Sequence, residues 1–205
     1  MTLGREVRAY IALIAITLAI FVFEKIGVSI TGSHALDADA WHVLGHSVPF
    51  AIGLWAFLIR QSQKNPTTME RLTSVCNIMF LAWVAYWAGT KGIERLFNPV
   101  HIPAGALLFF AIVGLFGNVL QLYFVHHTKH AHEEAHTYWG QVWHIVADLL
   151  TSVAVVGAGI LILWKGWILA DAIASFIVAF MVGILVLLQT KNLYGSLTHS
   201  KPSRF

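Results

Sequence analysis

Six long apolar segments limit this sequence to one fold class. They lie at about 9–30, 39–59, 72–93, 104–125, 138–164 and 168–189. Each reaches about the 20 residues that a helix needs to cross the hydrocarbon core of a bilayer. Apolar residues make up 58% of the sequence and charged residues only 11%, a balance typical of membrane proteins. The sequence therefore predicts an all-α polytopic membrane protein, with six transmembrane helices in a single domain over residues 1–205.

The basic residues indicate how the chain is oriented. An even number of spans places both termini on the same side of the membrane. Nine Lys and Arg residues fall on that side and four on the other, and an excess of positive charge marks the cytoplasmic side. We therefore expect both termini to be cytoplasmic. These residues are scattered between the spans and form no nucleic-acid footprint, so we expect no nucleic-acid partner.

The second apolar segment carries ionisable side chains that are costly inside a membrane. His42 and His46 stand one helical turn apart, and Asp39 lies one turn before His42. A charge at the centre of a spanning helix costs about 2.5–3.5 kcal/mol, so such residues need a partner or a function. Pro49 lies in the same segment and removes a backbone hydrogen bond. It predicts a kink near His46.

The fifth segment repeats the pattern with His144 and Asp148. Side chains four residues apart on a helix lie about 5–6 Å from each other, so each pair can bind one ion from one side. Three imidazoles and one carboxylate form a tetrahedral ligand set that zinc accepts. We therefore predict a metal site made of His42, His46, His144 and Asp148. Asp39 is expected to orient His42 by accepting a hydrogen bond, without binding the ion itself.

Metal ions and protons compete for such a site because only neutral imidazole binds a metal. The unperturbed pKa of histidine, about 6.5, lies close to physiological pH. A site that opens alternately to the two faces of a membrane would therefore exchange a metal ion for protons. The residues favour a secondary transporter, with no enzymatic activity and no permanent cofactor.

A second group of histidines lies in the loop 126–137, on the expected cytoplasmic side. Its members are His126, His127, His130, His132 and His136. This composition is typical of metal binding, although such tracts seldom form one fixed site. We expect low-affinity capture of metal ions there.

Three further features are expected to be structural. Glu94 and Arg95 should pair with each other at the end of the third span. Asp171 should cap the N-terminus of the sixth span, where a carboxylate is favourable. Gly114 and Gly117 should allow two helices to pack closely.

These motifs together resemble the transmembrane domain of the cation diffusion facilitator family of metal transporters. The stretches that carry the resemblance are Phe23-Glu24-x-Ile26-Gly27, Gly32-Ser33-x-Ala35-Leu36-x-Ala38-Asp39-Ala40-x-His42, Ile93-Glu94-Arg95-Leu96-x-Asn98-Pro99, and His144-x-x-x-Asp148 followed by Ser152-Val153. Asn118, Asp171 and the histidine-rich loop fit as well. The resemblance implies a homodimer of six-helix chains with cytoplasmic termini, which exports a divalent cation against an inward flow of protons. It implies that the four predicted ligands hold the transported ion.

The sequence departs from the family pattern at His46, where zinc-transporting members usually have Asp. Three neutral imidazoles and one carboxylate leave the loaded site with a charge of +1, which should weaken binding and raise its sensitivity to acid. Nitrogen-rich sites still suit Zn²⁺, and Co²⁺, Ni²⁺, Fe²⁺ and Cd²⁺ remain open as substrates.

We also expect no C-terminal cytoplasmic domain, as in the subgroup of the family that lacks it. We therefore expect a homodimer held by the transmembrane helices alone. The spans 39–59 and 72–93 are the expected contact, with Trp83 and Trp87 as anchors. A compact chain of this kind suggests a bacterial inner membrane.

The same histidines would also suit three other functions. A membrane di-iron oxidase or desaturase would also need several histidines, but it gathers them on the cytoplasmic face, whereas apolar helix separates His42 and His144 from the loop. A haem protein would use two opposed histidines and leave the residues four positions later without a role. A metal sensor that does not transport would bind metal without moving it.

Overall fold

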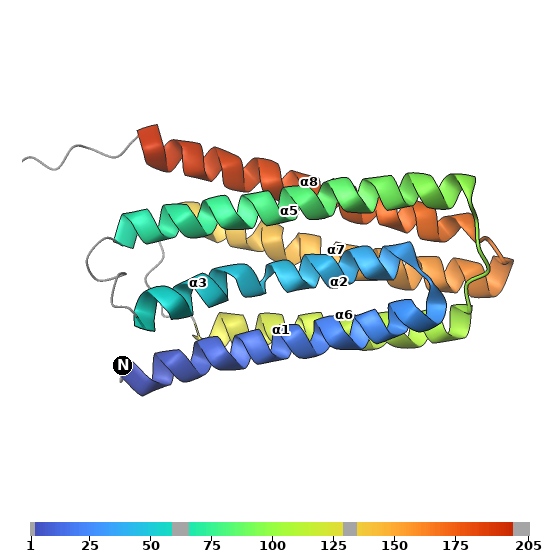
Figure 1. Ribbon diagram of the computed structural model, residues 1–205, viewed down its shortest axis with the longest axis horizontal. Coiled ribbons are helices and arrows are strands. Elements are labelled where there is room, and N and C mark those ends of the chain that lie inside the picture. The colour runs from blue at the N-terminus through green and yellow to red at the C-terminus, as the bar shows by residue number, and fades with distance from the viewer. Residues whose placement is uncertain (1–2, 59–65, 129–134, 199–205) are drawn as a thin grey trace, which may run out of the picture.

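The computed structural model describes residues 3–58, 66–128 and 135–198. These residues form helices and no strand, which confirms the all-α class. The helices are α1 (Leu3–Thr31), α2 (His34–Gly45), α3 (Ser47–Leu58), α5 (Pro66–Phe97), α6 (Ala104–Thr128), α7 (Ala135–Lys165) and α8 (Leu169–Thr198). They form one elongated bundle, and the start of α1 lies at the same end as the end of α8 (Figure 1).

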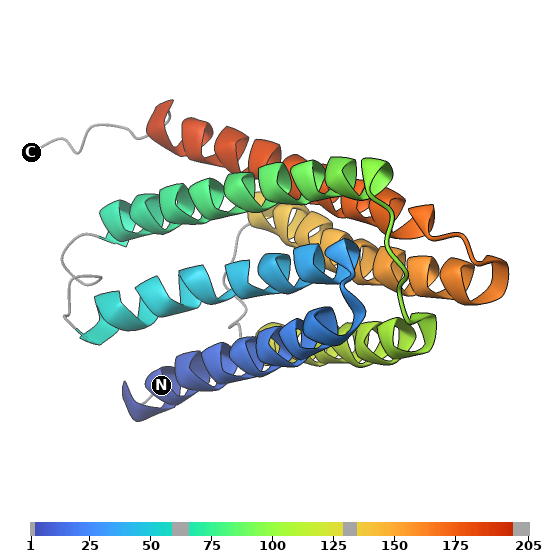
Figure 2. The same ribbon diagram turned by 45° about the vertical axis from the view of Figure 1, so that its right-hand side comes forward.

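Five of the described helices contain stretches long and apolar enough to cross a membrane. These stretches are Ile11–Thr31, Arg71–Phe97, Ala104–Gln121, Ala147–Lys165 and Leu169–Thr198. The predicted span 39–59 corresponds to α2 and α3, which have 12 residues each. Neither of these two helices alone reaches the roughly 20 residues that spanning requires. They follow each other end to end along the bundle (Figure 2).

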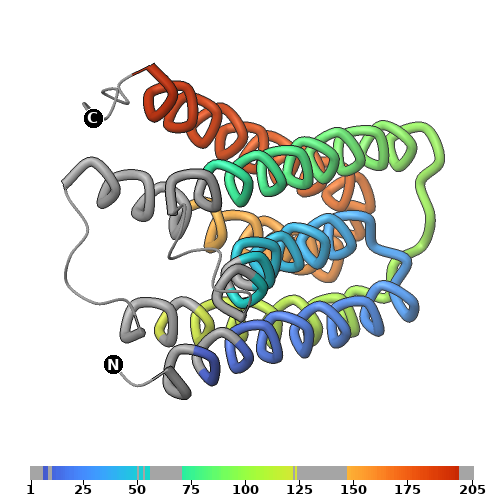
Figure 3. The backbone as a smooth tube through the Cα atoms, turned by 60° about the vertical axis from the view of Figure 1, so that its left-hand side comes forward, coloured from blue at the N-terminus to red at the C-terminus, as the bar shows by residue number. Residues whose placement is uncertain are grey.

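Helix α2 occupies the centre of the bundle. It contacts every other described helix: α1, α3, α5, α6, α7 and α8. Figure 3 shows it between the α1–α6 pair and the α5–α8 pair. Eight of its residues are buried, among them Asp39 and His42. A helix in this position can bring its polar side chains to neighbours on several sides.

The chain leaves regular helical geometry at His46, between α2 and α3. Pro49 has no N–H to donate to the carbonyl of Gly45. The N–H of His46 donates to the carbonyl of Val43 at 3.0 Å, which is the tighter spacing of a 3₁₀ turn. The hydrogen-bond pattern therefore changes at a predicted metal ligand, and the kink expected there stays a prediction.

Small residues allow α1 and α6 to approach each other closely. A Cβ atom added at Gly117 would lie 2.8 Å from Ile20, and one added at Gly114 would collide with Oε1 of Glu24. The prediction that these two glycines permit close packing is confirmed. Gly114 also leaves space for the carboxyl group of Glu24 at this interface.

Candidate metal centre

The N-terminus of α2 is held by a buried carboxylate from α8. Asp171 accepts hydrogen bonds from the Ser33 hydroxyl at 2.5 Å and from the backbone N–H groups of His34 and Ala35 at 3.0 and 3.2 Å. Ser33 also caps the helix, because its hydroxyl oxygen accepts from the N–H of Leu36 at 3.0 Å. N–H groups in the first turn of a helix have no partner within it, so these bonds fix where α2 begins.

Arg95 of α5 completes this group. Its Nε donates to Asp171 at 3.1 Å, and its Nη2 donates to the carbonyl of Gly32. Both charged side chains are buried. The predicted pair of Glu94 and Arg95 is wrong, because Glu94 accepts from Lys91 at 2.6 Å instead. The Asp171 side chain was expected to cap its own helix, α8. It instead accepts hydrogen bonds at the N-terminus of α2.

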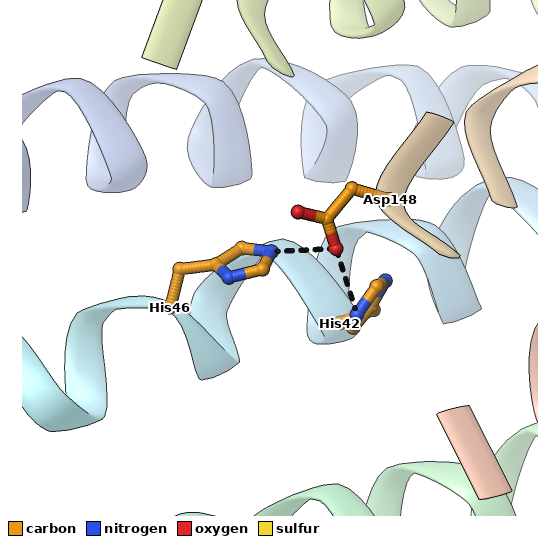
Figure 4. A group of neighbouring side chains, drawn as sticks. All are labelled: His42, His46 and Asp148. Atoms are coloured by element: carbon orange, nitrogen blue, oxygen red, sulfur yellow. Dashed lines mark ion pairs between the residues drawn. The ribbon is translucent and has the colours of Figure 1, made fainter. Parts of the chain in front are cut away.

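Three of the four predicted ligands lie together beside the break between α2 and α3. Nε2 of His42 and Nε2 of His46 each lie 3.5 Å from Oδ1 of Asp148 on α7. All three ligand atoms lie within 4.8 Å of one another. Figure 4 shows both rings directed at the same carboxylate oxygen. The helical spacing of the two histidines and the packing of α7 against α2 produce this cluster.

Two of the three distances in this cluster match the spacing of ligands in a zinc site. Zinc lies about 2.0–2.2 Å from nitrogen and oxygen ligands, so in a tetrahedral site the ligand atoms are roughly 3.3 Å apart. The two distances of 3.5 Å are close to that value. His42 is 1% exposed, whereas the side chains of His46 and Asp148 are 13% and 19% exposed. His46 and Asp148 are therefore the more accessible of the three side chains.

Thr151 orients the ring of His42. It lies three residues after Asp148, and its Oγ1 is 3.4 Å from Nδ1 of His42. The Thr151 hydroxyl donates its hydrogen to the backbone carbonyl of Asp148 at 2.9 Å. When Nδ1 carries the ring hydrogen, the Thr151 oxygen accepts from it, and the lone pair of Nε2 then faces the metal site.

Asp39 takes part in a chain of hydrogen bonds between helices. Its Oδ2 accepts from the Ser152 hydroxyl at 2.9 Å, and Ser152 accepts from Nδ2 of Asn118 at 2.8 Å. Asp39 thus joins α2 to α7 and α6, and its expected role in orienting His42 stays a prediction. Sequence reasoning missed Thr151, although its spacing from Asp148 places the two on one helix face.

The remaining predicted residues cannot be compared with the structure. The fourth predicted ligand, His144, belongs to α7, but its side chain lies outside the described residues. The loop histidines also lie outside the described residues or side chains; they are His126, His127, His130, His132 and His136. Their roles remain predictions.

Comparison with known proteins identifies one family. Residues 10–197 match the family described as the cation efflux transmembrane domain. The chain is 30% identical over 176 residues to the zinc transporter ZitB of Escherichia coli K12, a match that covers 82% of this chain and 55% of that protein.

Two further relatives come from other bacteria. The chain is 32% identical over 167 residues to the cadmium, cobalt and zinc/H(+)-K(+) antiporter of Bacillus subtilis, covering 78% of this chain and 53% of that protein. It is 30% identical over 193 residues to the metal cation efflux system protein CzcD of Cupriavidus metallidurans. That match covers 91% of this chain and 58% of that protein. The chain therefore spans a little more than half the length of these relatives.

Proposed function

Because the chain belongs to the family of cation efflux transmembrane domains, we propose that it exports a divalent metal cation across the cell membrane. The chain is a multi-pass membrane protein, as the family and the apolar helices indicate. The observation that carries the proposal is the convergence of His42, His46 and Asp148 on one point between α2 and α7. This point lies in the central part of the bundle, where a charged cluster without a ligand would be costly.

The proposed substrate is Zn²⁺. Two imidazoles and a carboxylate suit zinc better than Mg²⁺ or Mn²⁺, which prefer more oxygen ligands. The names of the relatives agree, since they include a zinc transporter and a cadmium, cobalt and zinc antiporter. His144, one turn before Asp148, is proposed as the fourth ligand. The loop histidines would capture ions at the cytoplasmic face before they reach this site.

Proton antiport is proposed as the source of energy. Imidazole must lose its proton to bind a metal, so each binding event displaces protons and each release takes them up. The Bacillus subtilis relative is named as an antiporter that uses H(+) and K(+). The break at His46 supports alternating access, because a helix already interrupted there can change its bend without losing regular hydrogen bonds.

The proposed assembly is a homodimer of chains with six spans and cytoplasmic termini. The pair α2 and α3 would form the second span. Trp83 of α5 packs on Trp41 and Phe80 with ring centroids 5.2 and 5.8 Å apart, and it is still 43% exposed. It therefore presents a rigid aromatic surface that a second copy of the chain would cover. Site-directed cross-linking at position 83 should yield dimers, and cross-linking on the exposed opposite face should not.

The family points to a transporter and not to an enzyme, which argues against the di-iron oxidase. A sensor that binds metal without moving it is the remaining alternative. The arrangement of His46 at a helix break favours transport over sensing, because a site built only for retention gains nothing from an interrupted helix.

The test is metal-dependent flux in proteoliposomes that contain the full chain. Zn²⁺, Cd²⁺, Co²⁺, Ni²⁺ and Mn²⁺ would be compared, with Asp148→Ala as the site variant and Glu94→Gln as a matched carboxylate control far from the site. We expect zinc flux coupled to proton flux, lost in Asp148→Ala and retained in Glu94→Gln. Binding without flux would identify a sensor and refute the proposal.

A further inference from the structure

Glu24 of α1 is a buried carboxyl group that the metal site does not use. Its side chain is 0% exposed. Neither of its oxygens has a hydrogen-bond partner among the described residues. Oε1 lies against Gly114 of α6, where any larger residue would collide with it. The bundle thus encloses a carboxyl group in a space that fits it and supplies no donor.

Among the residues that the structure describes, none places a positive charge against Glu24. Its neighbour Lys25 is engaged with Asp37 at 2.6 Å. The titratable group that acts on Glu24 from α2 is Asp39, another carboxyl. Helix α3 has no titratable residue, and on α6 the buried polar residues are the neutral Asn118 and Gln121. An ionised carboxylate in such a setting is costly, and a bound proton removes the charge.

Hydrogen bonds connect this region to the helix that carries the metal ligands. Asn118 lies one turn beyond Gly114 on α6, and its amide donates to Ser152, whose hydroxyl donates to Asp39. Asp39 lies three residues before His42 on α2. On the same side of Glu24, nearer the start of α1, the buried Thr17 accepts a hydrogen bond from Gln121 of α6 at 2.8 Å. Polar groups therefore continue from Glu24 along one side of an otherwise apolar interface.

We propose that Glu24 is a second proton-binding site, separate from the metal ligands and coupled to them by charge. This inference rests on the proposed function. When a divalent cation binds beside Asp39, its positive charge favours the ionised form of Glu24, and the carboxyl proton leaves to water. When the cation departs, Glu24 takes a proton up again. The ionised carboxylate would also offset the single positive charge that three imidazoles and one carboxylate leave on the loaded site.

The direct test counts the protons released per zinc ion bound. Zinc is titrated calorimetrically into the purified full chain in two buffers of different ionisation enthalpy, and Glu24→Gln is compared with the unaltered chain. Glu94→Gln is the matched control, because that carboxylate is exposed and paired with Lys91. We expect Glu24→Gln to bind zinc and to release about one proton fewer, with no change in the control. An unchanged proton count in Glu24→Gln would overturn the proposal.

A second measurement uses the unaltered chain, in case the Gln variant does not fold. Infrared difference spectra of protein labelled with ¹³C at the glutamate carboxyl should show zinc-induced loss of a protonated-carboxyl band at neutral pH. Absence of that change would also overturn the proposal. The outcomes separate the two hypotheses: zinc that binds but is not moved refutes transport, whereas flux with an unchanged proton count refutes the role of Glu24.

Discussion

Removal of the Asp171 side chain should destabilise the protein more than removal of its ion-pair partner. In Asp171→Ala the Arg95 guanidinium, 3% exposed, is left with the carbonyl of Gly32 as its acceptor. Loss of one member of a buried ion pair costs about 3–5 kcal/mol. The N–H groups of His34 and Ala35 also lose their acceptor, and a lost cap costs about 1 kcal/mol. We expect the free energy of unfolding of Asp171→Ala to fall by about 4–6 kcal/mol in total.

Arg95→Met should cost less because Asp171 retains other partners. The carboxylate still accepts from the Ser33 hydroxyl and from two backbone N–H groups. It also lies at the positive end of the α2 dipole. A lost hydrogen bond between charged groups costs about 1.5–3 kcal/mol. The difference between the two variants should therefore be about 3 kcal/mol, or roughly a hundredfold in the unfolding equilibrium.

The assay is reversible unfolding of the purified chain in mixed micelles, followed by helical circular dichroism. Zinc affinity measured on the same samples would report whether α2 still presents His42 correctly. Equal losses in the two variants, or a larger loss in Arg95→Met, would refute the argument that Asp171 is primarily the anchor of α2.

Three further predictions concern single side chains. Thr151→Val should weaken zinc binding about tenfold without loss of helix, because it removes the group beside Nδ1 of His42; a titration with unchanged affinity would show that Thr151 does not orient that ring. His46→Asp should retain transport, bind zinc more tightly and shift the pH optimum downward, since the added negative charge neutralises the loaded site; an unchanged pH profile of flux would count against it. Burial, followed by the nearby Arg95, lowers the pKa of His34. Its neutral form is therefore favoured in the folded state, and stability should fall as pH drops below the unfolded pKa of about 6.5. His34→Gln should lose less stability between pH 7.5 and 5.5 in the same unfolding assay, and identical losses would refute the assignment.

The parts of the site that depend on local periodicity could be predicted from the sequence. His42 and His46 share one face of a helix because they are one turn apart, and that spacing holds in any helical context. Pro49 predicts the break because it lacks an N–H, whatever surrounds it. Asp148 could be predicted as a third ligand because an ionisable group inside an apolar segment is costly and usually has a partner or a function.

The parts that depend on how helices meet could not be predicted. Asp171 and Arg95 are 76 residues apart, and nothing near either of them indicates that both reach the start of α2. Sequence proximity favoured Glu94 as the partner of Arg95, but the two are adjacent, and successive residues on a helix do not face each other. The sequence likewise does not show that Glu24 lacks a hydrogen-bond donor, because that depends on the packing of Gly114 of α6 against it.

X-ray absorption at the zinc edge of the zinc-loaded chain would identify the atoms that bind the ion. We expect a first shell of nitrogen and oxygen at about 2.0–2.1 Å, with imidazole scattering and no sulfur. We expect that shell to change in both Asp148→Ala and His46→Ala. A sulfur ligand, or variant spectra that are unchanged from that of the unaltered chain, would contradict the claim that His42, His46 and Asp148 hold the transported ion.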